Sequence, residues 1–246
     1  MTDAHSLLDV KARMAREGIS MEIPLAPLDK ESSLRLMKSV RPDCPDKDLD
    51  SLWNLSRGNP YFILGMLDSG YPETVVMPDA LKEVVLRGIS ALGKKAMDMA
   101  EYASVMGREF DLRVLEAVTK MTESEFYERI EHLFSRRVFI EHSDTGRCGF
   151  NPPLVQGIVY SSLSKPRASA MHKEVAVAIE ELYIDELEDH IFDLARHYLA
   201  AGDVEKGVHY AEMCAERCED TLSYSQAIEY LKACIQLMER QEKYKV

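Results

Sequence analysis

The chain contains 246 residues, of which 46% are hydrophobic and 29% charged, and its acidic residues outnumber the basic ones to give a formal net charge of −12. This composition excludes a wholly disordered chain, and at roughly 150 residues per domain the length predicts one or two domains. The negative charge repels nucleic-acid phosphates, so a DNA-binding function would require a local basic patch.

The first thirty residues predict one helix followed by one short strand. Apolar residues at helical spacing over residues 7–14 indicate an amphipathic helix that ends near Gly18. Alternating apolar residues next to prolines predict a short strand over residues 21–25, at an edge or an end of a sheet. Because a lone strand cannot satisfy its own backbone hydrogen bonds, this strand requires partners that the chain does not supply.

Helical periodicity dominates from residue 31 to residue 92. Helices are expected over residues 31–40, after Pro45, over residues 61–67, and from residue 78 to about residue 92. Gly58 can stop the second of these helices, and Pro60 can start the third at its first turn. The third helix is apolar on nearly every side, so we expect it to be buried.

Residues 94–163 predict a compact sequence of helices and a hairpin. The first helix should stop at Gly107, Asp111 is a good N-cap for the second, and Thr122 with Glu125 forms a capping box for the third. The two strands, their turn and a closing helix are expected at residues 138–140, 148–150, 143–146 and 154–163. Three helices followed by a hairpin describe a winged helix.

The remainder of the chain is predicted to be entirely helical. The spacing of its apolar residues is close to the helix-turn-helix spacing of tetratricopeptide repeats. Only about one and a half such units fit into residues 166–246, and a repeat needs a neighbour to bury its apolar face. The predicted fold class is therefore mainly α.

Short motifs along the chain occur in an order that is typical of one family. They are IPLAPLD at residues 23–29, GNPYFILGML at 58–67, MPDALKEVV at 77–85 and GREFD at 107–111. With the winged helix and the helical tail after them, the chain resembles the signal-transduction ATPases with numerous domains (STAND ATPases, related to the AAA+ proteins), in the branch of LuxR-type and AfsR-type regulators. The resemblance covers nearly the full chain.

This resemblance implies a domain organisation. Residues 1–29 would be a remnant of the nucleotide-binding domain, 30–92 a helical lid-like domain, 93–165 the winged helix and 166–246 the tetratricopeptide-like repeats. The phosphate-binding loop and the Walker B aspartate would lie upstream of Met1, on sequence that is absent here. The parent protein would be an ATPase, whereas this chain would not be an enzyme.

The resemblance also assigns a nucleotide-contacting role to Gly58, Asn59 and Pro60. In related ATPases the proline of a G-x-P motif in the lid packs near the adenine, so these residues would help to close a pocket formed mainly by the upstream domain. The alternative is a purely structural role, in which Gly58 ends one helix and Pro60 begins the next. No cofactor is expected in this chain alone, and ATP or ADP would bind only together with that upstream domain.

Other elements of nucleotide chemistry are missing from the sequence. Residues 88–95 almost fit the pattern G-x-x-x-x-G-K-[ST], but Lys95 replaces the hydroxyl that ligates magnesium, and the segment joins two predicted helices. Pro152 stands where the family often carries a phosphate-sensing histidine, and proline offers no side-chain donor. Gly88 stands where the family usually has an arginine, although Arg87 is adjacent. We therefore predict no catalytic residues.

Metal and DNA sites are not predicted either. Cys214 and Cys218 lie one helical turn apart, a spacing that fits the small apolar positions of helical repeats better than a zinc site. The third helix of the winged helix, residues 123–137, carries an excess of glutamate, whereas a helix that reads a DNA groove should be basic.

We therefore expect a non-catalytic regulatory portion of a signal-transduction ATPase, which relays the nucleotide state of an upstream domain to a protein-binding surface on the helical tail. One alternative is a stand-alone helical protein-interaction module, and another is a winged-helix, DNA-binding transcription regulator. The expected partners are proteins bound by the tail, with self-association as a further option and no membrane contact. The scattered cysteines, the lack of a signal-peptide core and the short apolar runs favour a cytoplasmic location.

Overall fold

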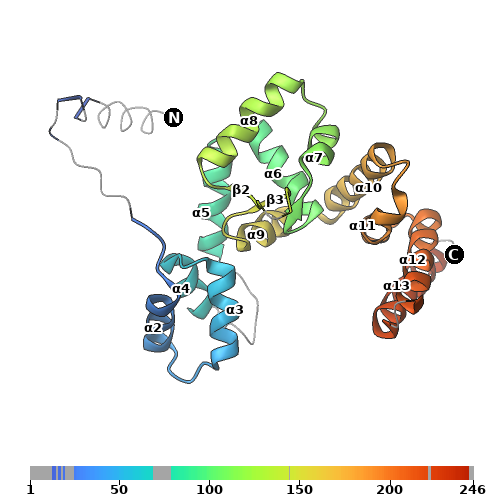
Figure 1. The fold of residues 1–246 in the computed structure, drawn as a ribbon, viewed down its shortest axis with the longest axis horizontal. Helices are drawn as coiled ribbons and strands as arrows, with labels where there is room; N and C mark the ends of the chain where they lie inside the picture. The colour runs from blue at the N-terminus through green and yellow to red at the C-terminus, as the bar shows by residue number, and fades with distance from the viewer. Residues whose placement is uncertain are drawn as a thin grey trace.

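The computed structural model describes residues 25–68, 79–143, 145–220 and 223–243, together with residues 13, 14, 16, 17 and 19. Most of the helix predicted before Gly18 and of the strand predicted over residues 21–25 therefore lies outside the described residues. Leu25, the described residue of that strand, has no regular secondary structure and is 92% exposed. The described part is mainly helical with one small antiparallel sheet (Figure 1), which confirms the predicted fold class.

Three short helices form the first unit of the chain (Figure 1). They are α2 (Lys30–Val40), α3 (Asp46–Ser56) and α4 (Pro60–Asp68). Asp29 caps α2, because its carboxylate accepts a hydrogen bond from the Ser32 N–H at 2.6 Å. The expected burial of the third helix holds for part of it: Phe62, Ile63, Met66 and Leu67 of α4 are at most 7% exposed, whereas Tyr61 and Leu64 are 51% and 41% exposed. The reason is that α4 packs against α2 and α3, which cover only part of its circumference.

A longer helix, α5 (Asp79–Ser90), leads from this unit to the next and packs against two of its helices. The next unit consists of α6 (Lys94–Met106), β1 (Glu109–Phe110), α7 (Leu112–Thr119), α8 (Glu123–Ser135), β2 (Phe139–Glu141), β3 (Cys148–Phe150) and α9 (Leu154–Ser162). The predicted stop at Gly107, the Asp111 cap and the capping box of Thr122 and Glu125 are all confirmed. The order of helices and strands is that of a winged helix.

The sheet contains a strand that the sequence did not reveal. β1 pairs antiparallel with β3, which lies between β1 and β2, so that Glu109 is opposite Gly149. With only two residues, β1 is too short to show the alternation by which strands are recognised. Phe110 from β1 nevertheless completes the core, because its ring lies 4.8 Å from that of Phe139 and 6.0 Å from that of Phe150, measured between centroids.

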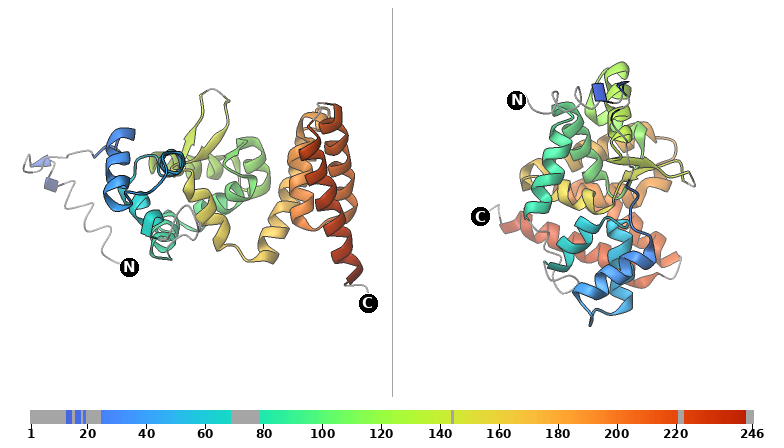
Figure 2. Two further views of the ribbon diagram at one scale, coloured as in Figure 1. Left: turned by 90° about the horizontal axis from the view of Figure 1, so that it is seen from below. Right: turned by 90° about the vertical axis from the view of Figure 1, so that its left-hand side faces the viewer.

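The tail contains four helices packed side by side, each against the next in sequence (Figure 2). They are α10 (Lys165–Leu182), α11 (Leu187–Ala201), α12 (Val204–Asp220) and α13 (Tyr224–Lys243). The Glu180 carboxylate of α10 joins three of them, because it accepts hydrogen bonds from the hydroxyls of Tyr198 at 2.6 Å and Tyr210 at 2.7 Å. Within the residues that the structure describes, no helix is long and apolar enough to cross a membrane.

Candidate functional site

The predicted nucleotide-contacting residues form the turn between α3 and α4. Gly58 has a φ of +76°, its carbonyl accepts a hydrogen bond from the Leu28 N–H at 2.9 Å, and a Cβ added to it would lie 2.0 Å from the Leu28 carbonyl oxygen. The Asn59 side chain caps α4 by accepting from the Tyr61 N–H at 3.0 Å, and Pro60 is the first residue of that helix. Each of the three residues thus has a local structural role, and nucleotide contact stays a prediction.

Two positions at which this sequence departs from the pattern of the STAND ATPases lie close together in the structure. Gly88 of α5 and Pro152, which precedes α9, line one cavity of about 670 Å³, and Phe62 of α4 lines it as well. Gly58, Asn59 and Pro60 are not among its lining residues. The residues that the resemblance associates with nucleotide binding are therefore divided between this cavity and the turn after α3.

A second cleft, which no pattern in the sequence predicted, lies between the first unit and the winged helix. Its volume is about 530 Å³, and Arg57 from the end of α3, Arg108 and His142 all line it. Glu109 is the acidic residue among its lining side chains. The cleft is a polar surface on which the two units face each other.

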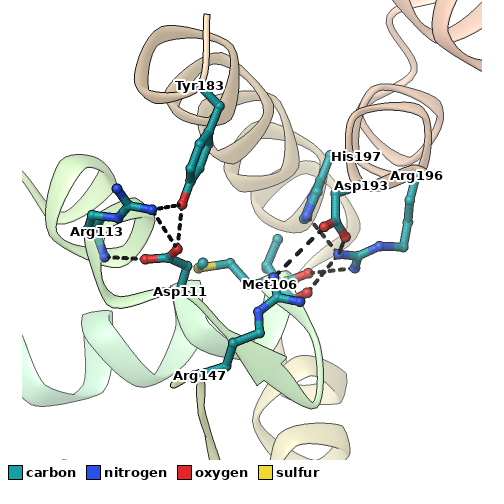
Figure 3. Close-up of polar contacts among 9 residues, drawn as sticks. Met106, Asp111, Arg113, Arg147, Tyr183, Asp193, Arg196 and His197 are labelled. Atoms are coloured by element: carbon teal, nitrogen blue, oxygen red, sulfur yellow. Dashed lines mark hydrogen bonds and ion pairs between the residues drawn. The ribbon is translucent and has the colours of Figure 1, made fainter. Parts of the chain in front are cut away.

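The winged helix meets the tail through a set of polar contacts (Figure 3). The Asp111 carboxylate caps α7 by accepting from the Arg113 N–H at 2.7 Å, and it also accepts a hydrogen bond from the Tyr183 hydroxyl at the end of α10. The Arg113 guanidinium donates to the same hydroxyl at 2.8 Å and lies 4.9 Å from the centre of the Tyr183 ring. Although burial raises the pKa of Asp111, the hydrogen bonds from Tyr183 and Arg113 outweigh it and hold the pKa below its ordinary value.

Arg196 of α11 makes the second set of contacts across this junction (Figure 3). Its guanidinium donates to the Met106 carbonyl at 2.7 Å and to the Asp193 carboxylate at 2.9 Å. Met106 is the last residue of α6, whose final carbonyls have no partner within the helix. Arg147 of the hairpin approaches Asp193 to 3.9 Å from the other side. The cavity left among these groups has a volume of only about 20 Å³, so the two units are in close contact.

A buried histidine pair continues from Arg196 into the core. His197 and His172 are 1% and 5% exposed, and their Nδ1 atoms are 2.8 Å apart. The Arg196 guanidinium can only donate, and it lies 3.0 Å from the His197 Nε2, which must therefore accept. The His197 Nδ1–H then donates to His172, whose Nε2–H donates to the Tyr160 hydroxyl of α9 at 3.1 Å. One directed chain of hydrogen bonds thus joins α9, α10 and α11.

Burial determines the protonation of this pair. Burial, assisted by the charge of Arg196, lowers the pKa of His172 to about 4, and the same two causes in the same order hold the pKa of His197 well below its ordinary value. Both imidazoles are neutral at pH 7. Neutral imidazoles are required here, because each Nδ1 must serve as donor or acceptor to the other.

The tail carries a groove between α11 and α13. Its volume is about 710 Å³, and Phe192, Arg196, Glu229 and Tyr230 are among its lining residues. The rings of Phe192 and Tyr230 lie 5.9 Å apart, and Phe192 is 38% exposed. On another face of the helix, α13 exposes four apolar side chains, which are Ile228, Leu231, Ile235 and Met238.

Metal-binding groups do not gather in the part of the chain that the structure describes, since no group there brings three or more His, Cys, Asp or Glu side chains together. Cys214 and Cys218 are buried between tail helices, and burial raises the pKa of the Cys214 thiol to about 12. No protein-family model, curated protein or solved structure matches this chain.

Proposed function

We propose that this chain is the regulatory, non-catalytic portion of a signal-transduction ATPase, and that it passes the nucleotide state of an upstream domain to a protein-binding surface on its tail. The observation that carries the proposal is the junction between the winged helix and the tail. Two separate sets of contacts, centred on Asp111 and Arg196, join these units around a cavity of about 20 Å³, with Arg113 2.8 Å from the Tyr183 hydroxyl and Arg196 2.7 Å from the Met106 carbonyl. A rotation of the winged helix would therefore carry α10 and α11 with it.

The groove between α11 and α13 supports a protein as the partner of the tail. Aromatic residues flanked by charges often anchor a bound protein segment, and here the exposed Phe192 and the half-buried Tyr230 lie with Arg196 and Glu229 along the groove. Arg196 belongs both to this groove and to the junction, so a partner in the groove would contact a residue that also holds α6. A cytoplasmic location accords with the free, buried cysteines.

The charge of α8 argues against the alternative of a DNA-binding regulator. In a winged helix this helix would enter the major groove, yet the side chains that it exposes include Glu123, Glu128 and Glu131. A carboxylate brought near DNA phosphates is repelled. The other alternative, a stand-alone interaction module, would use the same groove without any nucleotide.

Loss of the Asp111 cap is expected to loosen the tail as well as α7. In Asp111→Ala the Tyr183 hydroxyl loses its acceptor, and a lost N-cap costs about 1 kcal/mol, so amide hydrogen exchange in α10 and α11 should accelerate about fivefold. Thr122→Ala is the matched control, because it removes the N-cap of α8, which packs against α6 and β2 of the winged helix. Equal exchange rates in the tails of the two variants would contradict the relay.

Nucleotide titration tests whether this chain binds nucleotide by itself or requires an upstream domain. We expect no saturable binding of ATP or ADP to the chain alone below about 1 mM, because the turn at Gly58–Pro60 offers structural contacts but no cradle of backbone donors for phosphates. Calorimetry with each Mg²⁺-nucleotide measures this directly. Micromolar binding that a substitution in this chain abolishes would contradict the proposal.

A further inference from the structure

The cavity of about 670 Å³ among α4, α5, the end of α8 and α9 has an apolar floor. Phe62, Ile89 and Val155 line it and are only 7%, 2% and 5% exposed. Its size lies within the range of roughly 300–1,000 Å³ that is typical of small-molecule sites. An apolar group placed against this floor would be removed from water, which favours binding.

Two exposed arginines stand at the rim of the same cavity. Arg136 and Arg137 follow α8 directly and line the cavity beside Val138. Among the described residues, neither guanidinium takes part in a hydrogen bond or an ion pair, although most other arginines in the structure do. Two adjacent cations without partners attract an anion, and a guanidinium binds a carboxylate through two parallel hydrogen bonds.

We propose that this cavity binds a small amphiphilic carboxylate, with its apolar body on the floor and its carboxylate at Arg136 and Arg137. The apolar floor and the two arginines at the rim account for this choice of ligand. Apart from the arginines, the polar side chain at the cavity is that of Asn151, so a ligand with many polar groups, such as a sugar or a nucleotide, would leave most of them without partners. This inference stands whether or not an upstream ATPase domain exists.

Gly88 provides a way to fill the cavity without disturbing the fold. It lines the cavity from α5, and a Cβ added to it would meet no atom within 4 Å. Leucine at this position would occupy ligand space, and it is also a better helix former than glycine. Gly157 of α9 is the matched control, because it too is an exposed helical glycine with open space around its Cβ, but it does not line the cavity.

The test is calorimetric titration of the full chain with sodium decanoate. We expect saturable one-to-one binding that Gly88→Leu weakens at least tenfold and Gly157→Leu leaves unchanged. Arg136→Gln/Arg137→Gln should weaken it about tenfold, whereas Arg35→Gln/Arg129→Gln, which removes two cations that do not line the cavity, should not. Decyltrimethylammonium, with the same alkyl chain and a positive head, should bind at least tenfold more weakly than decanoate.

Three results would overturn the proposal. The first is an absence of saturable decanoate binding, and the second is equal binding to the Gly88→Leu and Gly157→Leu variants. The third is binding of an acidic amphipathic peptide, sensitive to Gly88→Leu, under conditions where decanoate does not bind, because the cavity would then belong to a protein partner. Melting curves of all variants identify any loss of binding that comes from unfolding.

Discussion

Acidification from pH 7 to pH 5 is expected to destabilise this protein by about 4 kcal/mol through His172 and His197 alone. In the unfolded chain each imidazole takes up a proton near pH 6.5, whereas in the folded chain burial lowers the pKa of His172 to about 4 and that of His197 well below 6.5. The unfolded state therefore binds more protons in this interval, and the free energy of unfolding falls with the pH. Each imidazole contributes about 2 kcal/mol over these two pH units.

The groups around His172 and His197 support the expected direction, a loss of stability as the pH falls. The charged group nearest to it is Arg196, a cation that opposes protonation, and the other neighbour is the Tyr160 hydroxyl. Asp193 pairs with Arg196 and not with either imidazole. Carboxylates with a lowered pKa, such as Asp111, add their own loss of stability only as the pH falls through and below about 4, outside the chosen interval.

Urea unfolding followed by circular dichroism at pH 7, 6 and 5 measures this effect. His172→Gln/His197→Gln should be less stable at pH 7, because the directed hydrogen bonds are lost, but its stability should change little between pH 7 and pH 5. Replacement of an exposed histidine, His132→Gln, should leave the wild-type pH dependence in place. A double variant that retains the full pH dependence would show that other groups are responsible.

The helix ends were the most predictable part of this fold. Gly107, Asp111 and the pair Thr122 and Glu125 act through atoms within three or four residues of themselves, so their effect can be read from local sequence. The turn at Gly58 and Pro60 is also close to its prediction, because Pro60 is the first residue of α4 and α3 ends at Ser56 with Arg57 as its C-cap, directly before Gly58. Whether that turn also contacts nucleotide depends on a partner surface that local sequence does not describe.

The junction could not be predicted from the sequence. The contact between Tyr183 and Asp111 joins residues 72 positions apart, and that between Arg196 and Met106 joins residues 90 positions apart. His172 and His197 lie on different helices, and no spacing in the sequence marks them as a pair. Their one sequence signal was weak: each lies on the apolar face of a predicted helix, where an imidazole requires a hydrogen-bond partner.

Gly58→Ala is expected to destabilise the unit of α2, α3 and α4 by about 3 kcal/mol. Alanine in the left-handed region costs about 1–2 kcal/mol. The added Cβ would also lie 2.0 Å from the Leu28 carbonyl oxygen, so the segment before α2 must move and the Leu28–Gly58 hydrogen bond, worth about 1 kcal/mol, is lost. The expected loss therefore has two parts, backbone strain and a collision with another backbone segment.

Gly202→Ala separates these two parts. Gly202 ends α11 with a φ of +74°, close to the +76° of Gly58, but a Cβ added there would meet no atom within 4 Å, so only the strain of about 1–2 kcal/mol is expected. The single tryptophan of the chain, Trp53, lies in α3, and its fluorescence during urea unfolding reports on the unit that Gly58 belongs to. Circular dichroism at 222 nm follows the helices as a whole in both variants. If both substitutions lower the free energy of unfolding equally, the segment before α2 does not pack against this turn. If Gly58→Ala lowers it more, packing against Leu28 is by itself a sufficient reason for glycine at this position. A nucleotide role for the turn must then rest on Asn59 and Pro60.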